Sequence, residues 1–181
     1  DRSSAASDVY KRQIINLTIP DVHFEVSKSI LEAGKHSYSE KPLSIKFEHG
    51  EELVNLANSK GLHMGCAPDT FLGAGIQEAK KIIDQDEIGN INLGSISMGV
   101  AGHEIWHPNP DFYYKYGGGP ILDMGPYYFT ALVNLLGPAK NVFTQSRTVY
   151  QKRVIGSGDR KGQEIEVEIP TTLVSQIEFQ N

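Results

Sequence analysis

The sequence has little cysteine, no long apolar run and no excess of positive charge. Cys66 is the only cysteine among 181 residues, which excludes an internal disulfide and suits a reducing compartment such as the cytoplasm. No apolar stretch approaches the roughly 20 residues that a membrane-spanning helix needs. The formal net charge of -5 gives no electrostatic attraction to nucleic acid or to anionic membranes. We therefore expect a cytoplasmic protein whose partners include neither nucleic acid nor a membrane.

Both ends of the sequence lack the features of natural ends. The chain begins with Asp1 rather than methionine, and residues 1–13 are rich in serine and show no hydrophobic period. Residues 8–13 also match the translation of a sequencing-adaptor end, while the last ten residues resemble a strand that stops in mid-run. We predict that residues 1–13 are a non-native leader, with a native flexible arm as the alternative. The whole chain is predicted to be an internal fragment of a longer protein.

Residues 14–68 alternate short apolar runs with amphipathic helical patterns. Strands are predicted at residues 14–19, 36–39 and 62–66, and the second helix at residues 48–60. The first helix is predicted to begin at Asp21 as its N-cap, with an inner face of Val22, Val26, Ile30 and Ala33. This strand–helix order is typical of a parallel sheet with right-handed crossovers. Pro20, Glu40-Lys41 and Ala67-Pro68 all follow strands, so they should share the carboxyl edge, where ligands bind.

Residues 69–181 show a different pattern, which predicts an antiparallel or mixed sheet backed by helices. Strands are predicted at residues 91–100 and 142–150, and alternating side chains from Ile165 to Phe179 predict one face of a further strand. Helices are predicted at residues 71–85 and 123–136, with Asp123 as the N-cap of the second. Residues 106–119 are expected to form a loop and residues 156–162 a turn.

The segment His103-Glu104-Ile105-Trp106-His107 matches the H-E-x-x-H pattern of zinc peptidases. That chemistry needs both histidines one turn apart on a helix. Gly102 weakens a helix here, and Pro108 directly after His107 opposes helical backbone at that residue. We therefore predict polar loop residues near a ligand rather than a metal site.

Three further motifs are informative only in combination. Glu40-Lys41-Pro42 follows a predicted strand, although a lysine in that position is usually a solvated charge. Gly117-Gly118-Gly119 allows close approach of a ligand but also suits an ordinary turn. Asp123-Met124-Gly125-Pro126-Tyr127 follows it at the start of a helix, where an aspartate often has a capping role.

In this order and spacing the motifs resemble those of the Gfo/Idh/MocA family of glucose–fructose oxidoreductases and inositol dehydrogenases. The resemblance begins at Ile14 and runs to the end of the chain; its other segments are Ile19-Pro20-Asp21-Val22-His23, Ala33-Gly34-Lys35-His36 and Glu87-Ile88-Gly89. It implies an α/β fold, with the C-terminal part of a Rossmann domain at residues 14–68. Residues 69–181 would form part of an α+β domain with a large open sheet. The implied activity is hydride transfer between NAD or NADP and a sugar or cyclic polyol, often in a homo-oligomer.

The resemblance also implies roles for single residues. Lys41 matches the family's catalytic lysine, whose following proline is often preceded by a cis peptide, and Asp123 matches a family aspartate. Tyr127 stands where many members have histidine, so either Tyr127 or Lys41 is the expected proton acceptor. Trp106, together with Lys41, Asp123 and Tyr127, is predicted to contact substrate, although core packing is an equal alternative for Trp106. The residues predicted to contact the cofactor are Ile19, Pro20, His23, Glu40, Lys41 and Pro42, with helix capping as the alternative for His23.

The glycine-rich phosphate loop of such a domain is expected to precede Ile14 and has no counterpart in the sequence. This chain is therefore expected to hold only the nicotinamide side of the cofactor site. The competing hypothesis is a family member that binds a sugar or nucleotide without catalysis.

Overall fold

The structure is a computed structural model that describes residues 11–180. The chain divides into two compact units, residues 1–68 and residues 69–181, and each is described here by itself. Most of the predicted leader lies outside the described residues. The described part already belongs to the fold at Arg12, whose carbonyl oxygen accepts a hydrogen bond from the His36 amide at 2.9 Å.

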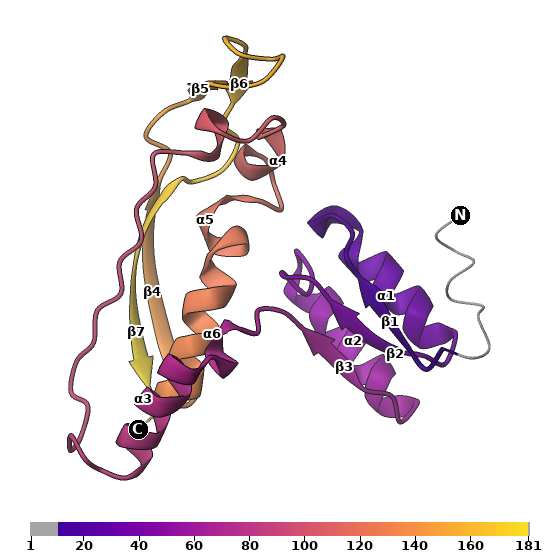
Figure 1. Ribbon diagram of the computed structural model, residues 1–181, viewed down its shortest axis with the longest axis vertical. Coiled ribbons are helices and arrows are strands. Elements are labelled where there is room, and N and C mark those ends of the chain that lie inside the picture. Colours follow the sequence, from indigo (N-terminus) through magenta and orange to yellow (C-terminus); the bar gives the residue numbers. More distant parts are fainter. Residues whose placement is uncertain (1–10, 181) are drawn as a thin grey trace. The chain divides into compact units, whose positions relative to one another are not determined.

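The first unit contains a parallel sheet of three strands in the order β1–β2–β3 (Figure 1). The strands are β1 (Gln13–Asn16), β2 (His36–Ser39) and β3 (Met64–Cys66). Both pairings are parallel, so the predicted sheet is confirmed, and β1 begins one residue before the expected boundary. A Cβ atom on Gly65 would lie 2.7 Å from the Tyr38 ring of the neighbouring strand, which explains a glycine within this short strand.

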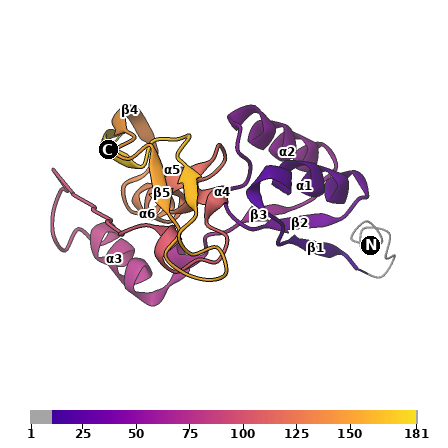
Figure 2. The same cartoon turned by 90° about the horizontal axis from the view of Figure 1, so that it is seen from above.

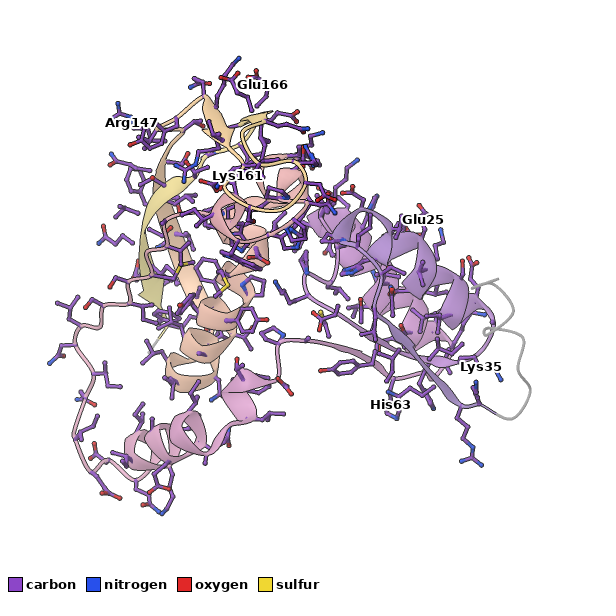
Figure 3. The ribbon with its side chains drawn as sticks, turned by 45° about the horizontal axis from the view of Figure 1, so that its top comes forward. Glu25, Lys35, His63, Arg147, Lys161 and Glu166 are labelled. Carbon is purple, nitrogen blue, oxygen red and sulfur yellow. The ribbon has the colours of Figure 1, made fainter. Side chains whose placement is uncertain are left out.

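Two helices, α1 (His23–Glu32) and α2 (Phe47–Ser59), cover one face of this sheet (Figure 2). Leu31 from α1 and Leu53 and Ala57 from α2 are buried against each other and form the core of the unit. The predicted second helix is therefore confirmed. Glu25 on the outer side of α1 points away from the unit (Figure 3).

The first helix differs from its prediction at its start and in its buried face. Pro20–Val22 form a 3-10 turn (η2), and α1 follows with Val22 as its N-cap, so Asp21 does not cap it. Val22 is exposed, whereas His23 and Ser27 are buried together with Ile30 and Leu31. The helix is rotated relative to the apolar pattern because polar contacts of His23 and Ser27, described below, hold these residues inward.

The second unit consists of short helices followed by two antiparallel strand pairs. Its helical elements in chain order are η3 (Thr70–Leu72), α3 (Ala74–Asp84), η4 (His103–Ile105), α4 (Asp111–Tyr114), α5 (Gly119–Asp123) and α6 (Gly125–Leu136). Its strands are β4 (Ala139–Arg147), β5 (Lys152–Val154), β6 (Glu164–Glu166) and β7 (Thr172–Phe179). Strand β4 pairs with β7 and β5 pairs with β6, which confirms the predicted antiparallel arrangement.

The core of the second unit joins α4 to the β5–β6 hairpin. Tyr113 and Tyr114 from α4 are buried with Ile155, Ile165 and Val167. Helix α6 packs against α3 and η3. Glu166, whose neighbours Ile165 and Val167 are buried, points outward (Figure 3).

Three predictions for the second unit were wrong in detail. Residues 91–100 are irregular instead of a strand, and Leu93 is 91% exposed. A strand needs a neighbouring strand to which it can hydrogen-bond, and among the described residues this stretch has no such partner. Asp123 ends α5 instead of capping the next helix, whose N-cap is Met124. The alternating stretch 165–179 divides into β6 and β7, which belong to different strand pairs.

Candidate active site

The loops that follow the three parallel strands lie side by side at the carboxyl edge of the sheet, as predicted. The Glu40 amide donates a hydrogen bond to the Asn16 carbonyl oxygen at 2.9 Å, and the Ala67 amide donates to the Ser39 carbonyl oxygen at 2.9 Å. The Cys66 thiol contacts the Glu40 carbonyl oxygen at 3.6 Å. The end of β2 and the residue after it are therefore hydrogen-bonded on both sides, to β1 and to the residue that follows β3.

The buried side chain of His23 contacts the loop that carries Lys41. Its side chain is fully buried, with Nδ1 at 2.6 Å from the Pro42 carbonyl oxygen and Nε2 at 2.9 Å from the Thr18 carbonyl oxygen. Carbonyl oxygens only accept hydrogen bonds, so both ring nitrogens would donate at once only in the imidazolium form. This geometry gives His23 a positioning role, and its predicted contact with the cofactor stays a prediction. The capping alternative is wrong, because Val22 caps α1 and no side chain bonds there.

Asn16 is a supporting residue that the sequence reasoning missed. It is 1% exposed, and its Nδ2 donates to the His23 carbonyl oxygen and to Ser27 Oγ, both at 3.0 Å. Its Oδ1 accepts hydrogen bonds from the Thr18 amide at 3.2 Å and hydroxyl at 2.6 Å. An asparagine inside the apolar run 14–19 was the available signal, because a buried amide requires partners that hold a specific geometry.

The Lys41 loop, residues 40–43, is shaped by local hydrogen bonds. The Lys41 amide donates to its neighbour Glu40 Oε2 at 3.0 Å, and the Lys41–Pro42 peptide is cis, as the resemblance implied. Pro42 is buried, while Lys41 is partly exposed. Ile19 on the neighbouring loop is 65% exposed and offers an apolar surface at the same edge.

Cys66 lies at this edge in surroundings that disfavour its thiolate form. Burial, and then the nearby carboxylate of Glu40, raise the pKa of the Cys66 thiol to about 11. The thiol, not the thiolate, is therefore the form present near neutral pH.

We expect Cys66 of the folded protein to react slowly with iodoacetamide. Raising the pKa from 9.0 to about 11 lowers the thiolate fraction at about pH 8 by roughly 100-fold, and alkylation should slow by about that factor. Mass spectrometry of the peptide containing Cys66 measures this rate, and the protein unfolded in urea is the control. Equal rates for the folded and unfolded protein would contradict the assignment.

The second unit brings together a group that we call the Asp123 cluster: His103, Tyr113 and Asp123. His103 Nε2 lies 3.4 Å from Asp123 Oδ2, and their side chains are 15% and 20% exposed. The His103 ring stacks on Tyr113 with 3.8 Å between ring centroids. Burial, followed by the charges of Asp123 and Glu104, raises the pKa of Tyr113 to about 12, so this ring stays neutral.

The backbone beside His103 is fixed by a buried ion pair. Glu104 is 4% exposed, and its Oε1 accepts hydrogen bonds from Arg153 Nε at 2.7 Å and lies 2.5 Å from Arg153 Nη2. The Tyr114 hydroxyl also donates to Glu104, and Arg153 donates to the Ala101 carbonyl oxygen. Arg153 on β5 is therefore hydrogen-bonded to residues on both sides of His103, namely Ala101 and Glu104.

This arrangement differs from that of a zinc peptidase. His103–Ile105 form a single 3-10 turn instead of a helix, and the Glu104 side chain is bonded to Arg153 and Tyr114.

Asp123 and Tyr127 flank the junction between α5 and α6. Asp123 is the last residue of α5, and Tyr127 lies in the first turn of α6. A negative charge close to the start of α6 is favoured by the helix dipole. Gly119 begins α5 with a φ of +80°, and a Cβ atom there would lie 2.3 Å from Ile169, so this turn requires glycine. Trp106 is 63% exposed, so simple core packing does not account for it.

The structure thus pairs Asp123 with His103, a partner that the sequence reasoning mentioned only within the zinc pattern. Lys41 belongs to the first unit, and Trp106, Asp123 and Tyr127 belong to the second.

Comparison with known proteins matches both units to one family. Residues 8–67 match the model of an oxidoreductase family with an NAD-binding Rossmann fold, and residues 76–181 match that of the GFO/IDH/MocA C-terminal domain. The chain belongs to the Gfo/Idh/MocA family. The predicted family and fold class are therefore confirmed, and the first unit contains part of an NAD-binding Rossmann domain.

Two curated relatives illustrate the family. The oxidoreductase YhhX of Escherichia coli is 33% identical over 155 residues, which cover 84% of this chain and 43% of YhhX. The scyllo-inositol 2-dehydrogenase (NADP+) IolW of Bacillus subtilis is 25% identical, over 72% of this chain and 36% of IolW. The chain therefore spans less than half the length of these relatives.

Two solved structures share the fold at low identity. Levoglucosan dehydrogenase, solved with NADH and levoglucosan, has a TM-score of 0.79 and 22% identity, with 99% of this chain and 48% of that chain covered. The super-repressor mutant of Gal80p from Saccharomyces cerevisiae has a TM-score of 0.83 and 19% identity, with coverage of 99% and 49%. Because dehydrogenases and a repressor share this fold, the activity has to be argued from the site.

Proposed function

We propose that the whole protein carrying this chain is an NAD(P)-dependent oxidoreductase. It would transfer a hydride between the nicotinamide and a hydroxyl or carbonyl group of a sugar or cyclic polyol. The observation that carries this proposal is the position of Lys41 on a braced loop at the carboxyl edge of parallel strands, within a family of NAD-binding oxidoreductases. The named relatives include a scyllo-inositol and a levoglucosan dehydrogenase, which supports a polyol or sugar substrate.

The residues at the edge of the first unit fit the nicotinamide end of the cofactor. Parallel sheets bind ligands beyond the carboxyl ends of their strands, where these loops converge. Ile19 and Pro20 offer apolar surface for a planar ring, and Glu40, Lys41 and Pro42 form the adjacent loop. His23 would act through Pro42, whose carbonyl oxygen it contacts. When bound, the nicotinamide accepts or donates the hydride.

We propose that the chain's own residues manage the charge and the proton of the reaction. The Lys41 ammonium would stabilise negative charge that develops on the reacting oxygen. Asp123 would orient the substrate, and Trp106 would cover one of its apolar faces. Tyr127 or Lys41 would accept the hydroxyl proton in the oxidative direction.

We further propose that the whole protein is a cytoplasmic homo-oligomer that associates through the β4–β7 ribbon. Phe143 and Val174 lie on one face of this ribbon and are 64% and 71% exposed. Apolar side chains that are exposed on a strand pair are typical of surfaces that another chain covers.

The proposal is tested by adding NAD or NADP to the whole protein with a panel of polyols and sugars and recording the absorbance of the reduced nicotinamide. Turnover with at least one compound is the expected result, and it identifies the cofactor and the substrate class. Cofactor binding without turnover on the whole panel would favour a non-catalytic sugar- or nucleotide-binding protein. The absence of cofactor binding, measured by calorimetry, would contradict the proposal.

A further inference from the structure

The Lys41 loop is held at two backbone positions, and both of these contacts lead back to Asn16 at the end of β1. The Glu40 amide donates to the Asn16 carbonyl oxygen at 2.9 Å. The Pro42 carbonyl oxygen lies 2.6 Å from His23 Nδ1, and Asn16 Nδ2 donates to the His23 carbonyl oxygen at 3.0 Å. Lys41 lies between Glu40 and Pro42, so the path of its backbone depends on Asn16 from both directions.

Asn16, Thr18 and His23 form a closed set of contacts, which we call the Asn16 network. Asn16 Oδ1 accepts hydrogen bonds from the Thr18 amide at 3.2 Å and from the Thr18 hydroxyl at 2.6 Å. The Thr18 carbonyl oxygen lies 2.9 Å from His23 Nε2, and the bond from Asn16 Nδ2 to the His23 carbonyl oxygen closes the set. Asn16 Nδ2 also donates to Ser27 Oγ at 3.0 Å.

The Asn16 side chain uses its whole hydrogen-bonding capacity in this buried place. A primary amide has two donor hydrogens and an oxygen that accepts two bonds, and all four have partners here. Neither an aspartate nor an apolar side chain of similar size supplies that combination.

The location of the Asn16 network points to a role beyond stability. Buried hydrogen bonds add little net stability when compared with apolar groups of the same shape, whereas a fully satisfied network fixes one geometry. Asn16 and His23 are 1% and 0% exposed, so solvent does not compete for these bonds. The fixed geometry lies at the carboxyl edge of the parallel strands, where the position of a ligand-binding loop matters.

We propose that Asn16 is a positioning residue for Lys41 in the reaction. This inference rests on the proposed function, in which the Lys41 ammonium stabilises charge on the reacting oxygen. Asn16 acts on the backbone at Glu40 directly and at Pro42 through His23. A displacement of a reacting group by about 1 Å can lower a rate by about 100-fold, so a loosened Lys41 loop would slow the reaction.

The test is a double-mutant cycle in the whole protein, on a substrate that the wild type turns over. We expect Asn16→Ala alone to lower kcat by about 10- to 100-fold, with the affinities for substrate and cofactor changing less than about threefold. In the Lys41→Met background the same substitution should change kcat by less than about twofold, because the group that it misplaces is gone. Asn55→Ala removes an exposed asparagine from α2 and should behave as the wild type.

Two results of this cycle would overturn the inference. One is a loss of less than about threefold in Asn16→Ala, which would show that the position of Lys41 does not depend on Asn16. The other is an equal fold loss in both backgrounds, which is the result expected if Asn16 only stabilises the unit.

A second measurement does not depend on activity, and Thr18→Val provides a milder variant if Asn16→Ala does not fold. Thr18→Val removes only the hydroxyl bond to Asn16 Oδ1. Hydrogen exchange is followed at the Glu40 amide, bonded to Asn16, and at the Ala67 amide, bonded to Ser39 on the other side of β2. We expect exchange at Glu40 to accelerate by about fivefold or more and exchange at Ala67 by less than about twofold. Unchanged exchange at Glu40, or equal acceleration at both amides, would contradict the inference.

Failure of the proposed function gives a different result from failure of this inference. Lack of turnover by the wild type on the whole panel would refute the proposed function, and the role of Asn16 with it. Turnover by the wild type, with equal losses from Asn16→Ala in the two backgrounds, would refute only the role of Asn16.

Discussion

Lys41→Met in the whole protein is expected to lower kcat by about 100-fold or more, equivalent to about 2.7 kcal/mol of transition-state stabilisation. The substitution keeps a long side chain on the loop but removes the ammonium group. Because stabilisation of a developing alkoxide acts mainly in the transition state, kcat should fall more than the affinity for substrate. Steady-state kinetics on the substrate found in the panel measures both quantities.

Lys46→Met is the matched control for this experiment. Lys46 is exposed and lies just before α2 in the same unit, so the variant loses the same charge outside the loop braced by His23. Its kinetics should stay close to those of the wild type. Near-normal turnover by Lys41→Met would refute the role assigned to Lys41, and a similar loss in Lys46→Met would indicate a general charge effect.

Glu104→Ala is expected to destabilise the segment around His103 by about 3 kcal/mol or more. Removing one partner of a buried ion pair leaves the other without compensation, and here both Arg153 and the Tyr114 hydroxyl lose their acceptor. The Gly156 amide reports on this region, because it donates to the Glu104 carbonyl oxygen at 2.7 Å. Its protection against hydrogen exchange should therefore fall by about 100-fold or more.

Lys152→Met provides the comparison, because Lys152 lies next to Arg153 on β5. Lys152 pairs with Glu164 at 2.8 Å and with Glu166 at 3.2 Å, but these side chains are more than half exposed. Exposed ion pairs contribute little, so exchange at Gly156 should hardly change in this variant. Unchanged exchange at Gly156 in Glu104→Ala would show that the ion pair does not hold the segment.

The parallel unit was predictable because its local and long-range signals agree. Short apolar runs separated by amphipathic helices leave few possible topologies, and they fix which loops meet at the carboxyl edge. The rotation of α1 was missed because its apolar pattern points to Val22 and Val26, whereas buried polar contacts of Asn16 hold the helix at His23 and Ser27. Side-chain hydrogen bonds of this kind leave no periodic signal.

The second unit was less predictable because its site depends on tertiary contacts. His103 and Asp123 are twenty positions apart in irregular or short elements, and only the fold shows that they meet. Residues 91–100 look like a strand in composition, yet strand formation depends on a neighbour that local sequence does not specify. The motif around Asp123 was recognisable through its family resemblance, but its partner His103 was hidden in a pattern typical of a different chemistry.

Isotope tracing tests the central claim, hydride transfer, most directly. The whole protein would be given the alcohol found in the panel, carrying deuterium at the carbon that is oxidised, together with the oxidised cofactor. NMR of the product is expected to show deuterium at the C4 position of the reduced nicotinamide, on one face of the ring. Deuterium released into the solvent, with none on the nicotinamide, would contradict the proposed reaction.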